Sequence, residues 1–341
     1  MIDLRSDTVT KPTIGMLEAM SKAKVGDDVF GEDPAVNEFQ KRMAEMFGQQ
    51  SGLFVPSGTM SNQLCIQILT SPGDEVIVDE LSHLFNYEAG AASVLSGVQL
   101  RPLKGNRGML YAEQVEKAIR TKNEWDPHTR VIALENTTNK GGGTVYNLET
   151  IQEIRGVANK HGLSMHLDGA RIWNALIEAD YSAEQIGAQF DTISICFSKG
   201  LGAPIGSMML SSEENIKKAR RVRKMFGGGM RQIGLLAEAA SFAVEHHASL
   251  LETDHYRARR LAEIISKNDA FEIDRMSVQT NILLFDVVDK TAEEFLRILE
   301  TAGIKMTAFG PQTIRAVFHF QITDEDFNVV THFFENYVNY D

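Results

Sequence analysis

The chain has 341 residues, and its 43% hydrophobic and 23% charged residues are typical of a folded protein and exclude a disordered one. The formal net charge of −12 argues against a nucleic acid or an anionic membrane as the main partner. No apolar run approaches membrane-spanning length, and the two cysteines lack CxxC spacing. We therefore expect a cytoplasmic protein with free thiols and with no metal, membrane or nucleic-acid partner.

Short apolar runs alternate with helical patterns through the first two thirds of the chain. A helix is expected from Pro34, with Asp33 as its N-cap and Gly48 at its end. Helical periodicity also marks residues 60–70 and 148–161. The expected strands are residues 52–55, 75–78, 98–103, 130–136, 163–168, 192–197 and 207–212. Strands that alternate with helices predict an α/β fold with a mostly parallel sheet covered on both faces.

The pattern changes after Arg231, where a long helical region runs to about Lys267 and connects two parts of the chain. Strands are expected beyond it at residues 271–276, 282–288 and 314–320, and helices at residues 292–301 and 324–337. This tail predicts a smaller α+β domain. We place a large domain at residues 1–245 and a small C-terminal domain at residues 246–341.

Three short stretches near strand ends carry candidate chemistry. The segment Ser57-Gly58-Thr59 follows a strand and opens a helix, whose free N–H groups suit a phosphate, although a plain helix cap is an alternative. Asp168 ends an apolar strand where open α/β sheets bind ligands, although it could be an N-cap paired with Arg171. Lys199 follows the next strand, and a solvated loop lysine is the alternative there.

Taken together, these features match the needs of pyridoxal 5′-phosphate (PLP). A partly desolvated lysine near cationic groups has a lowered pKa and can attack a carbonyl, so Lys199 could form an imine with the cofactor. Asp168 could keep the pyridine nitrogen protonated, and the helix end at Gly58 could hold the phosphate. The chain contains no GxGxxG, GK[ST] or HExxH motif, which weakens dinucleotide, nucleotide-phosphate and zinc-protease interpretations.

The sequence resembles the low-specificity L-threonine aldolases, including the L-allo-threonine aldolases, within the fold type I PLP-dependent transferase-like enzymes. The resemblance covers nearly the whole chain and rests on long strings: DLRSDTVTKPT, GDDVFGEDPAVNEFQ, PSGTMSNQ, DELSHLFNYE, LENTTNKGGG, HLDGARIWNA, SKGLGAPIGS and RKMFGGGMRQIG. It implies a mostly parallel seven-stranded sheet. It also implies retro-aldol cleavage of β-hydroxy-α-amino acids to glycine and an aldehyde, which is acetaldehyde when the substrate is threonine.

The resemblance assigns the cofactor contacts by position. Lys199 would be the Schiff-base lysine, and Asp168 would pair with the pyridinium nitrogen. His83, in DELSHLFNYE, would stack on the ring face and is our candidate for the base that takes the β-hydroxyl proton. Gly58 and Thr59 would hold the phosphate. For His83 alone, a helix-start or core histidine is the alternative.

The resemblance also assigns substrate contacts and an assembly. Arg171 would contact the phenolic oxygen of the cofactor or the substrate, and Ser6 and Arg315 would bind the substrate carboxylate. Lys224 and Arg231, from RKMFGGGMRQ, would reach a neighbouring subunit's site near the phosphate, which implies a homotetramer built from dimers. Alternatively, Ser6 could only form a turn and Arg315 could be an exposed edge residue.

Some positions depart from the family pattern. Members commonly carry LENTHN and GDDVYGEDP, where this chain has Thr138 and Phe30, and Trp125 stands near a position that is often histidine. In the family that histidine is associated with the substrate hydroxyl, and here His128 stands a short way downstream of Trp125. The basic run at residues 217–224 is most simply the wet face of a helix, from which only Lys224 is assigned to the site.

Two other functions stay open on the sequence alone. One is another fold type I enzyme with the same cofactor, such as a β-eliminating lyase or a transaminase. The other is a non-catalytic cofactor-binding protein, which the presence of both Lys199 and Asp168 argues against.

Overall fold

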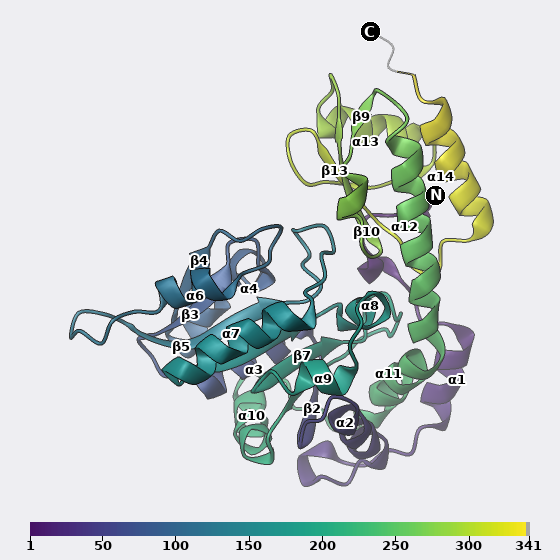
Figure 1. The fold of residues 1–341 in the computed structure, drawn as a ribbon. Helices are drawn as coiled ribbons and strands as arrows, with labels where there is room; N and C mark the ends of the chain where they lie inside the picture. The colour runs from purple at the N-terminus through teal and green to yellow at the C-terminus, as the bar shows by residue number, and fades with distance from the viewer. Residues whose placement is uncertain (339–341) are drawn as a thin grey trace.

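The computed structural model describes residues 1–338, in which a seven-stranded sheet forms the centre of the larger part (Figure 1). The strand order is β2-β8-β7-β6-β5-β3-β4, and all strands run parallel except β8, which is antiparallel to both neighbours. The strands are β2 (Ser51–Val55), β3 (Asp74–Asp79), β4 (Gln99–Leu103), β5 (His128–Glu135), β6 (Ser164–Gly169), β7 (Thr192–Cys196) and β8 (Ser207–Ser211). This confirms the predicted α/β fold with a mostly parallel sheet.

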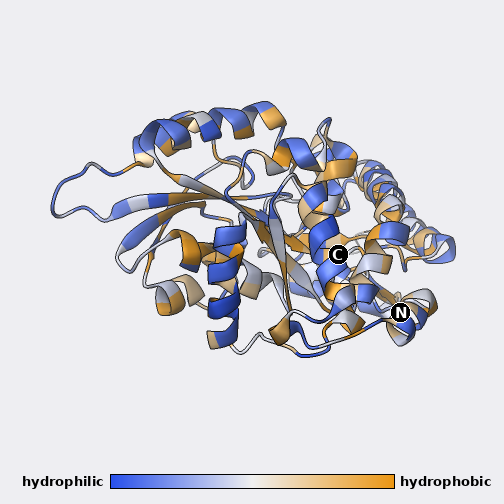
Figure 2. Cartoon of the chain, turned by 90° about the horizontal axis from the view of Figure 1, so that it is seen from below, coloured by the Kyte–Doolittle hydropathy of each residue, from blue (hydrophilic) through white to orange (hydrophobic). Residues whose placement is uncertain are grey.

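Amphipathic helices cover the sheet, and α7 crosses one of its faces in Figure 1. These helices carry both hydrophilic and hydrophobic residues, as Figure 2 shows, because one side of each faces the sheet and the other faces solvent. The helices of this part are α1 (Ile14–Lys22), α2 (Pro34–Met46), α3 (Gly58–Leu69), α4 (His83–Asn86), α5 (Ala91–Ser96), α6 (Ala112–Ala118), α7 (Leu148–His161), α8 (Ile172–Glu178), α9 (Ala183–Gly187), α10 (Glu213–Met225) and α11 (Gly234–His247), with short 3₁₀ turns η1 (Asp7–Val9) and η2 (Asp28–Phe30).

The C-terminal part has its own sheet and its own core. Its sheet has the order β12-β13-β10-β9, with antiparallel pairing throughout, and Phe271, Phe285, Phe295 and Phe334 pack beneath it. The first residues of the chain join this core, because β1 (Ile2–Asp3) pairs with β11 (Ile304–Lys305). The remaining elements are β9 (Phe271–Glu272), β10 (Ile282–Val287), β12 (Thr307–Ala308), β13 (Thr313–Val317), α12 (Leu251–Ile265), α13 (Ala292–Thr301), α14 (Asp324–Asn336), η3 (Ala248–Leu250) and η4 (Arg275–Ser277).

We predicted one long connecting helix after Arg231, and the prediction of a single helix is wrong. The helical region is there, but it consists of two helices, α11 and α12, separated by η3. The break follows His247, the last residue of α11. This residue contacts the turn after β7, with 2.8 Å between its Nδ1 and the carbonyl oxygen of Leu201. The strand expected at residues 271–276 is also shorter and ends at Glu272, followed by η4. The predicted division of the chain at residue 245 stays a prediction. No helix within residues 1–338 is long and apolar enough to cross a membrane.

Only some of the side chains in the basic run at residues 217–224 face solvent. Arg223 on α10 is buried, pairs with the buried carboxylate of Asp28, and donates from Nη1 to the carbonyl oxygen of Phe54 at 2.7 Å. Arg220 also reaches Asp28, with 3.0 Å between Nη2 and Oδ1. The expectation of a fully solvated face therefore fails at Arg223, because a buried acid on another segment pairs with it.

We expect the substitution Arg223→Leu to lower the free energy of unfolding by about 3 kcal/mol, because it leaves the Asp28 carboxylate buried with a single, longer ion pair. Urea denaturation of the purified protein measures this difference. Arg221→Leu, at an exposed position of the same helix, is the matched control and should change the value by less than about 0.5 kcal/mol. Equal effects of the two substitutions would contradict the interpretation.

Candidate active site

A pocket of about 530 Å³ lies beside the carboxyl ends of the central strands. It contains five of the predicted site residues, Ser6, His83, Arg171, Lys199 and Arg315. Its wall comes from both parts of the molecule, since Arg315 lies on β13, residues 307–308 form β12, and Phe309 follows β12. The other residues of the wall are Thr8, Tyr87, Glu135, Asn139, Lys140 and Ala170.

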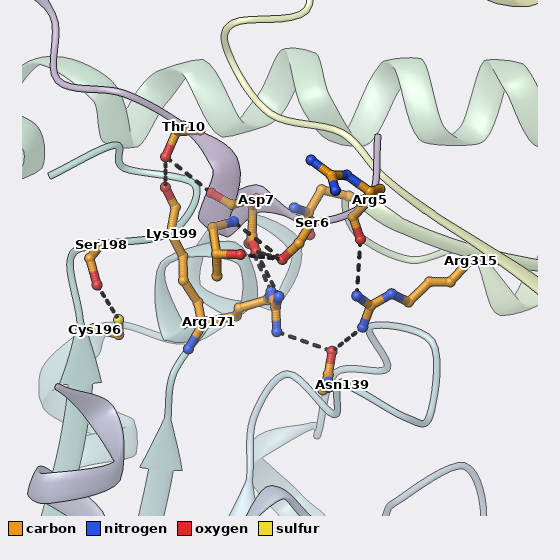
Figure 3. Close-up of polar contacts among 12 residues, drawn as sticks. Arg5, Ser6, Asp7, Thr10, Asn139, Arg171, Cys196, Ser198, Lys199 and Arg315 are labelled. Atoms are coloured by element: carbon orange, nitrogen blue, oxygen red, sulfur yellow. Dashed lines mark hydrogen bonds and ion pairs between the residues drawn. The ribbon is translucent and has the colours of Figure 1, made fainter. Parts of the chain in front are cut away.

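Lys199 enters this pocket from the turn that follows β7. The hydroxyl of Thr10 donates to its backbone carbonyl at 2.9 Å, and Figure 3 shows its side chain running alongside Arg171. Within residues 1–338, no hydrogen bond or ion pair occupies its Nζ. Its positive charge contributes to a lowered pKa at the buried groups Asp7 and Cys196. The amine therefore has no partner in the described chain, and its predicted reaction with a carbonyl stays a prediction.

Asp168 is buried at the end of β6 and is held in a fixed orientation. Its Oδ2 accepts a hydrogen bond from Asn62 on α3 at 2.8 Å, and its Oδ1 accepts one from the backbone N–H of Ala170 at 3.1 Å. Such donors stabilise the charged carboxylate. An oriented carboxylate at this edge can hold a protonated ring nitrogen, although Asp168 itself does not line the pocket wall.

His83 lies at the start of α4 and is oriented by a buried acid. Its Nδ1 is 2.8 Å from Oε1 of Glu88, which also accepts from Asn62 at 2.8 Å, while the other oxygen of Glu88 accepts from Gln63 at 2.6 Å. Burial alone would lower the pKa of His83, but the Glu88 hydrogen bond and the carboxylates of Asp168 and Glu135 together raise it. The arrangement leaves Nε2 of His83 as the nitrogen that can exchange a proton in the pocket.

Glu135 lines the pocket and accepts hydrogen bonds from two backbone N–H groups. Its oxygens accept from the N–H groups of His83 and Asn139, each at 2.6 Å. Burial, together with the nearby Asp168 charge, raises the pKa of Glu135 to about 7. The strand register places Glu135 opposite Asp168, which explains their interaction. Glu135 therefore fixes the segments that carry His83 and Asn139.

Two arginines form the cationic end of the pocket (Figure 3). Arg171 makes a bidentate pair with the buried Asp7, at 2.8 Å from Nε and 2.7 Å from Nη2. The oxygen of Asn139 accepts from Arg315 at 2.9 Å and from Arg171 at 3.4 Å. Arg315 keeps a buried Nε with no partner in the described chain, and burial beside Arg171 lowers its pKa to about 10. Of the two, Arg315 has free capacity for a carboxylate.

Arg315 is not the exposed edge residue that was the alternative, because β13 lies between β12 and β10 and the side chain is buried. Ser6 forms the turn that was its alternative role, and its predicted contact with the substrate carboxylate stays a prediction. Ser6 lines the pocket, and its Oγ accepts from the backbone N–H of Thr8 at 3.2 Å as the cap of η1.

The first turn of α3 fits a phosphate on two observations. Ser57 caps the helix, which leaves Gly58 and Thr59 in the first turn, where backbone N–H groups are free. A Cβ added at Gly58 would lie 3.7 Å from Oγ of Ser207, and this buried hydroxyl has no partner within residues 1–338. With Lys199 and Asp168, these residues fit PLP.

Lys224 and Arg231 do not line the pocket of their own chain. Lys224 is exposed near the end of α10, and Arg231 forms an exposed ion pair with Asp27 at 2.8 Å. Their predicted role in a neighbouring subunit's site stays a prediction.

His83, Glu88 and Asp168 offer ligand atoms within 4.8 Å of one another, a spacing that a metal ion could use. Each of these side chains already has hydrogen-bond partners in the protein, and Glu88 accepts from three donors. The trio therefore suits a hydrogen-bonded cofactor site better than a metal centre.

His166 contacts Asn62, which orients Asp168, and its burial predicts how the stability of the protein depends on pH. It is fully buried, with 3.0 Å between Nδ1 and Oγ1 of Thr192 and 3.2 Å between Nε2 and Oδ1 of Asn62. Burial lowers its pKa to about 4. As the pH falls from 6.5 towards 4, the unfolded chain takes up a proton at this residue and the folded chain does not, so folding loses stability.

For His166 this loss amounts to on the order of 3 kcal/mol at pH 4. We expect His166→Gln to make the free energy of unfolding fall less steeply between pH 7 and pH 4.5 than in the unmodified protein. Urea denaturation at the two pH values measures the slope. Parallel slopes would show that His166 is not held neutral in the folded state.

Comparison with known proteins agrees with this geometry. The model of the family described as Beta-eliminating lyase matches residues 3–288. A structure of SPT with bound PLP shares the fold, with a TM-score of 0.75 and 19% identity over 98% of this chain and 86% of that chain. Fold and site together define a PLP-dependent lyase of fold type I.

Two further matches narrow the class. Low-specificity L-threonine aldolase 1 of Arabidopsis thaliana is 40% identical and covers 95% of this chain and 93% of its own length. The structure of threonine aldolase from Leishmania major has a TM-score of 0.84 at 18% identity, over 98% of this chain and 99% of that chain. The chain belongs to the family of the low-specificity L-threonine aldolases.

Sequence reasoning missed the residues that hold the site together: Asp7, Asn62, Glu88, Glu135, Asn139 and Ser207. All six stand in strings that carried the resemblance, but without an assigned role. The signal that could have found some of them is their position at the carboxyl end of a strand or in the first turns of the following helix, where ligands bind in α/β folds.

Proposed function

We propose that this protein cleaves L-threonine and L-allo-threonine to glycine and acetaldehyde, and other β-hydroxy-α-amino acids to glycine and the matching aldehyde. The observation that carries the proposal is one pocket that brings together Lys199, whose Nζ has no partner in the described chain, the two arginines Arg171 and Arg315, and His83. The oriented carboxylate of Asp168 lies behind these side chains. When bound, PLP supplies an electron sink that weakens a bond to Cα of the amino acid.

In this proposal each side chain has one task. Arg315, held by Asn139 at 2.9 Å, binds the substrate carboxylate together with Ser6. Fixing the carboxylate orients the bond between Cα and Cβ, and orientation alone contributes a large part of such catalysis. Nε2 of His83 takes the β-hydroxyl proton, since Glu88 holds the other nitrogen. Lys199 carries the cofactor, and Asp168 keeps its ring nitrogen protonated.

The same proposal includes a homotetramer of dimers in which Lys224 and Arg231 act in a neighbour's site. Its support is that neither residue lines its own pocket and that apolar side chains such as Ile14, Phe30 and Met225 are more than half exposed in the single chain. A cytoplasmic location and a role in threonine breakdown and glycine formation belong to the proposal as well. The free thiols of Cys65 and Cys196 suit a reducing compartment.

Incubation of the holoenzyme with L-threonine, L-allo-threonine and L-phenylserine tests the reaction. Glycine with an equimolar aldehyde supports the aldolase. Release of 2-oxobutyrate and ammonia from threonine would instead indicate β-elimination, and transfer of the amino group to a 2-oxo acid would indicate a transaminase.

A further inference from the structure

A lysine at the outer edge of the pocket has no anionic partner. Lys140 lines the pocket, and its Nζ lies 5.8 Å from the centre of the Tyr87 ring. Within residues 1–338, no carboxylate forms an ion pair with it. The other cations of the pocket are committed in the proposed function, because Arg171 is paired with Asp7 and the remaining two bind cofactor and α-carboxylate. Among the lysines and arginines that line the pocket in the described chain, Lys140 is the one to which the proposed function assigns no task.

Its position relates Lys140 to the part of the substrate that varies. The Tyr87 ring lies 5.6 Å from the His83 ring, so Tyr87 is a neighbour of both the proposed base and Lys140 on the pocket wall. In the proposed function, a substrate whose β-hydroxyl meets His83 brings its Cβ substituent to the part of the pocket that Tyr87 and Lys140 line.

The backbone of Lys140 is also fixed relative to the carboxylate anchor. Its neighbour Asn139 accepts from Arg315 at 2.9 Å and donates its backbone N–H to Glu135 at 2.6 Å. The segment that carries Lys140 is thus held beside Arg315, the proposed anchor of the α-carboxylate. A cation so placed distinguishes substrates by the charge at the end of their side chain.

We propose that Lys140 makes this enzyme prefer β-hydroxy-α-amino acids with an anionic side chain, of which β-hydroxyaspartate is the simplest, over neutral ones of the same shape. This inference rests on the proposed function. In the reaction the bond from Cα to Cβ breaks and its electron pair stays with Cα, which takes up a proton. The hydroxyl loses its proton as its oxygen becomes a carbonyl. The products are glycine and glyoxylate, and the step needs no oxidant.

The test compares two nearly isosteric substrates, L-β-hydroxyaspartate and L-β-hydroxyasparagine, on the holoenzyme. The variants are Lys140→Met, Lys140→Arg and, as a control, Lys122→Met at an exposed position outside the pocket. We expect kcat/KM to favour the anion roughly fivefold at low salt, as for a partly exposed ion pair. Lys140→Met should lose this preference, Lys140→Arg and Lys122→Met should keep it, and added salt should reduce it.

A binding readout accompanies the kinetics. Inhibition of threonine cleavage by L-aspartate should be stronger than inhibition by L-asparagine, and Lys140→Met should remove the difference. Equal kcat/KM for the two hydroxy acids, or a preference that survives Lys140→Met, overturns the proposal. So does a rise in KM by the same factor for threonine and both hydroxy acids, since this would place the α-carboxylate on Lys140. Failure to cleave threonine at all would count against the proposed function instead.

Discussion

Lys199→Ala should abolish the cleavage of L-threonine, with kcat/KM falling by roughly four orders of magnitude or more, because covalent catalysis and the anchor of the cofactor are lost together. The free Nζ in the pocket leads to this expectation. Lys199 is partly buried, and its positive charge lowers the pKa of Asp7 and Cys196. Lys199→Ala should therefore raise the pKa of both groups in the protein without cofactor.

Three measurements separate a chemical role from a structural one. Mass spectrometry after borohydride reduction should find the cofactor attached to the peptide that contains Lys199 in the unmodified protein and to no peptide in Lys199→Ala. Circular dichroism should show that the variant is folded. Lys122→Ala should retain both the adduct and the activity. An adduct on another lysine, or cleavage within tenfold of the unmodified rate by Lys199→Ala, would contradict the assignment.

The strands of the large sheet are the part of the fold that the sequence predicts best. All seven begin and end within two residues of the expected positions, and α7 and α13 have the expected bounds. The strands of a covered parallel sheet are apolar on both faces, so their signal is continuous. The break between α11 and α12 lies at His247, which contacts Leu201, and a contact between residues so far apart in the sequence leaves no periodic signal.

The site divides in the same way. Lys199 and Asp168 could be found because the ends of parallel strands meet at one edge of the sheet. Glu88 could not, because it lies in the irregular segment between α4 and α5, where no periodic pattern marks it, and yet it is buried and joined to His83 and, through Asn62, to Asp168. Trp125, which stands near the position that is often histidine in the family, is 75% exposed before β5 and is not among the residues that line the pocket in the described chain.

The second large effect is expected at Asp168. Asp168→Asn keeps the shape of the side chain but replaces a carboxylate by a neutral amide, so a protonated ring nitrogen loses its counter-charge in a buried place. We expect kcat for threonine cleavage to fall by roughly a thousandfold while the protein still binds PLP through Lys199. The pH dependence of the cofactor's absorbance should change as well, because the ring nitrogen then loses its proton at lower pH.

Asn62 gives this prediction its internal check. Its amide donates both to Asp168 and to Glu88, at 2.8 Å each, and no other described side chain joins the two acids directly. Asn62→Ala leaves the charge of Asp168 in place but removes its orientation, so its loss in kcat should be smaller than that of Asp168→Asn. Asp191→Asn, in an ion pair with Arg155 at the other end of the sheet, should leave kcat unchanged. If Asp168→Asn retained a tenth of the activity, the carboxylate would be a structural cap and not the partner of the ring nitrogen.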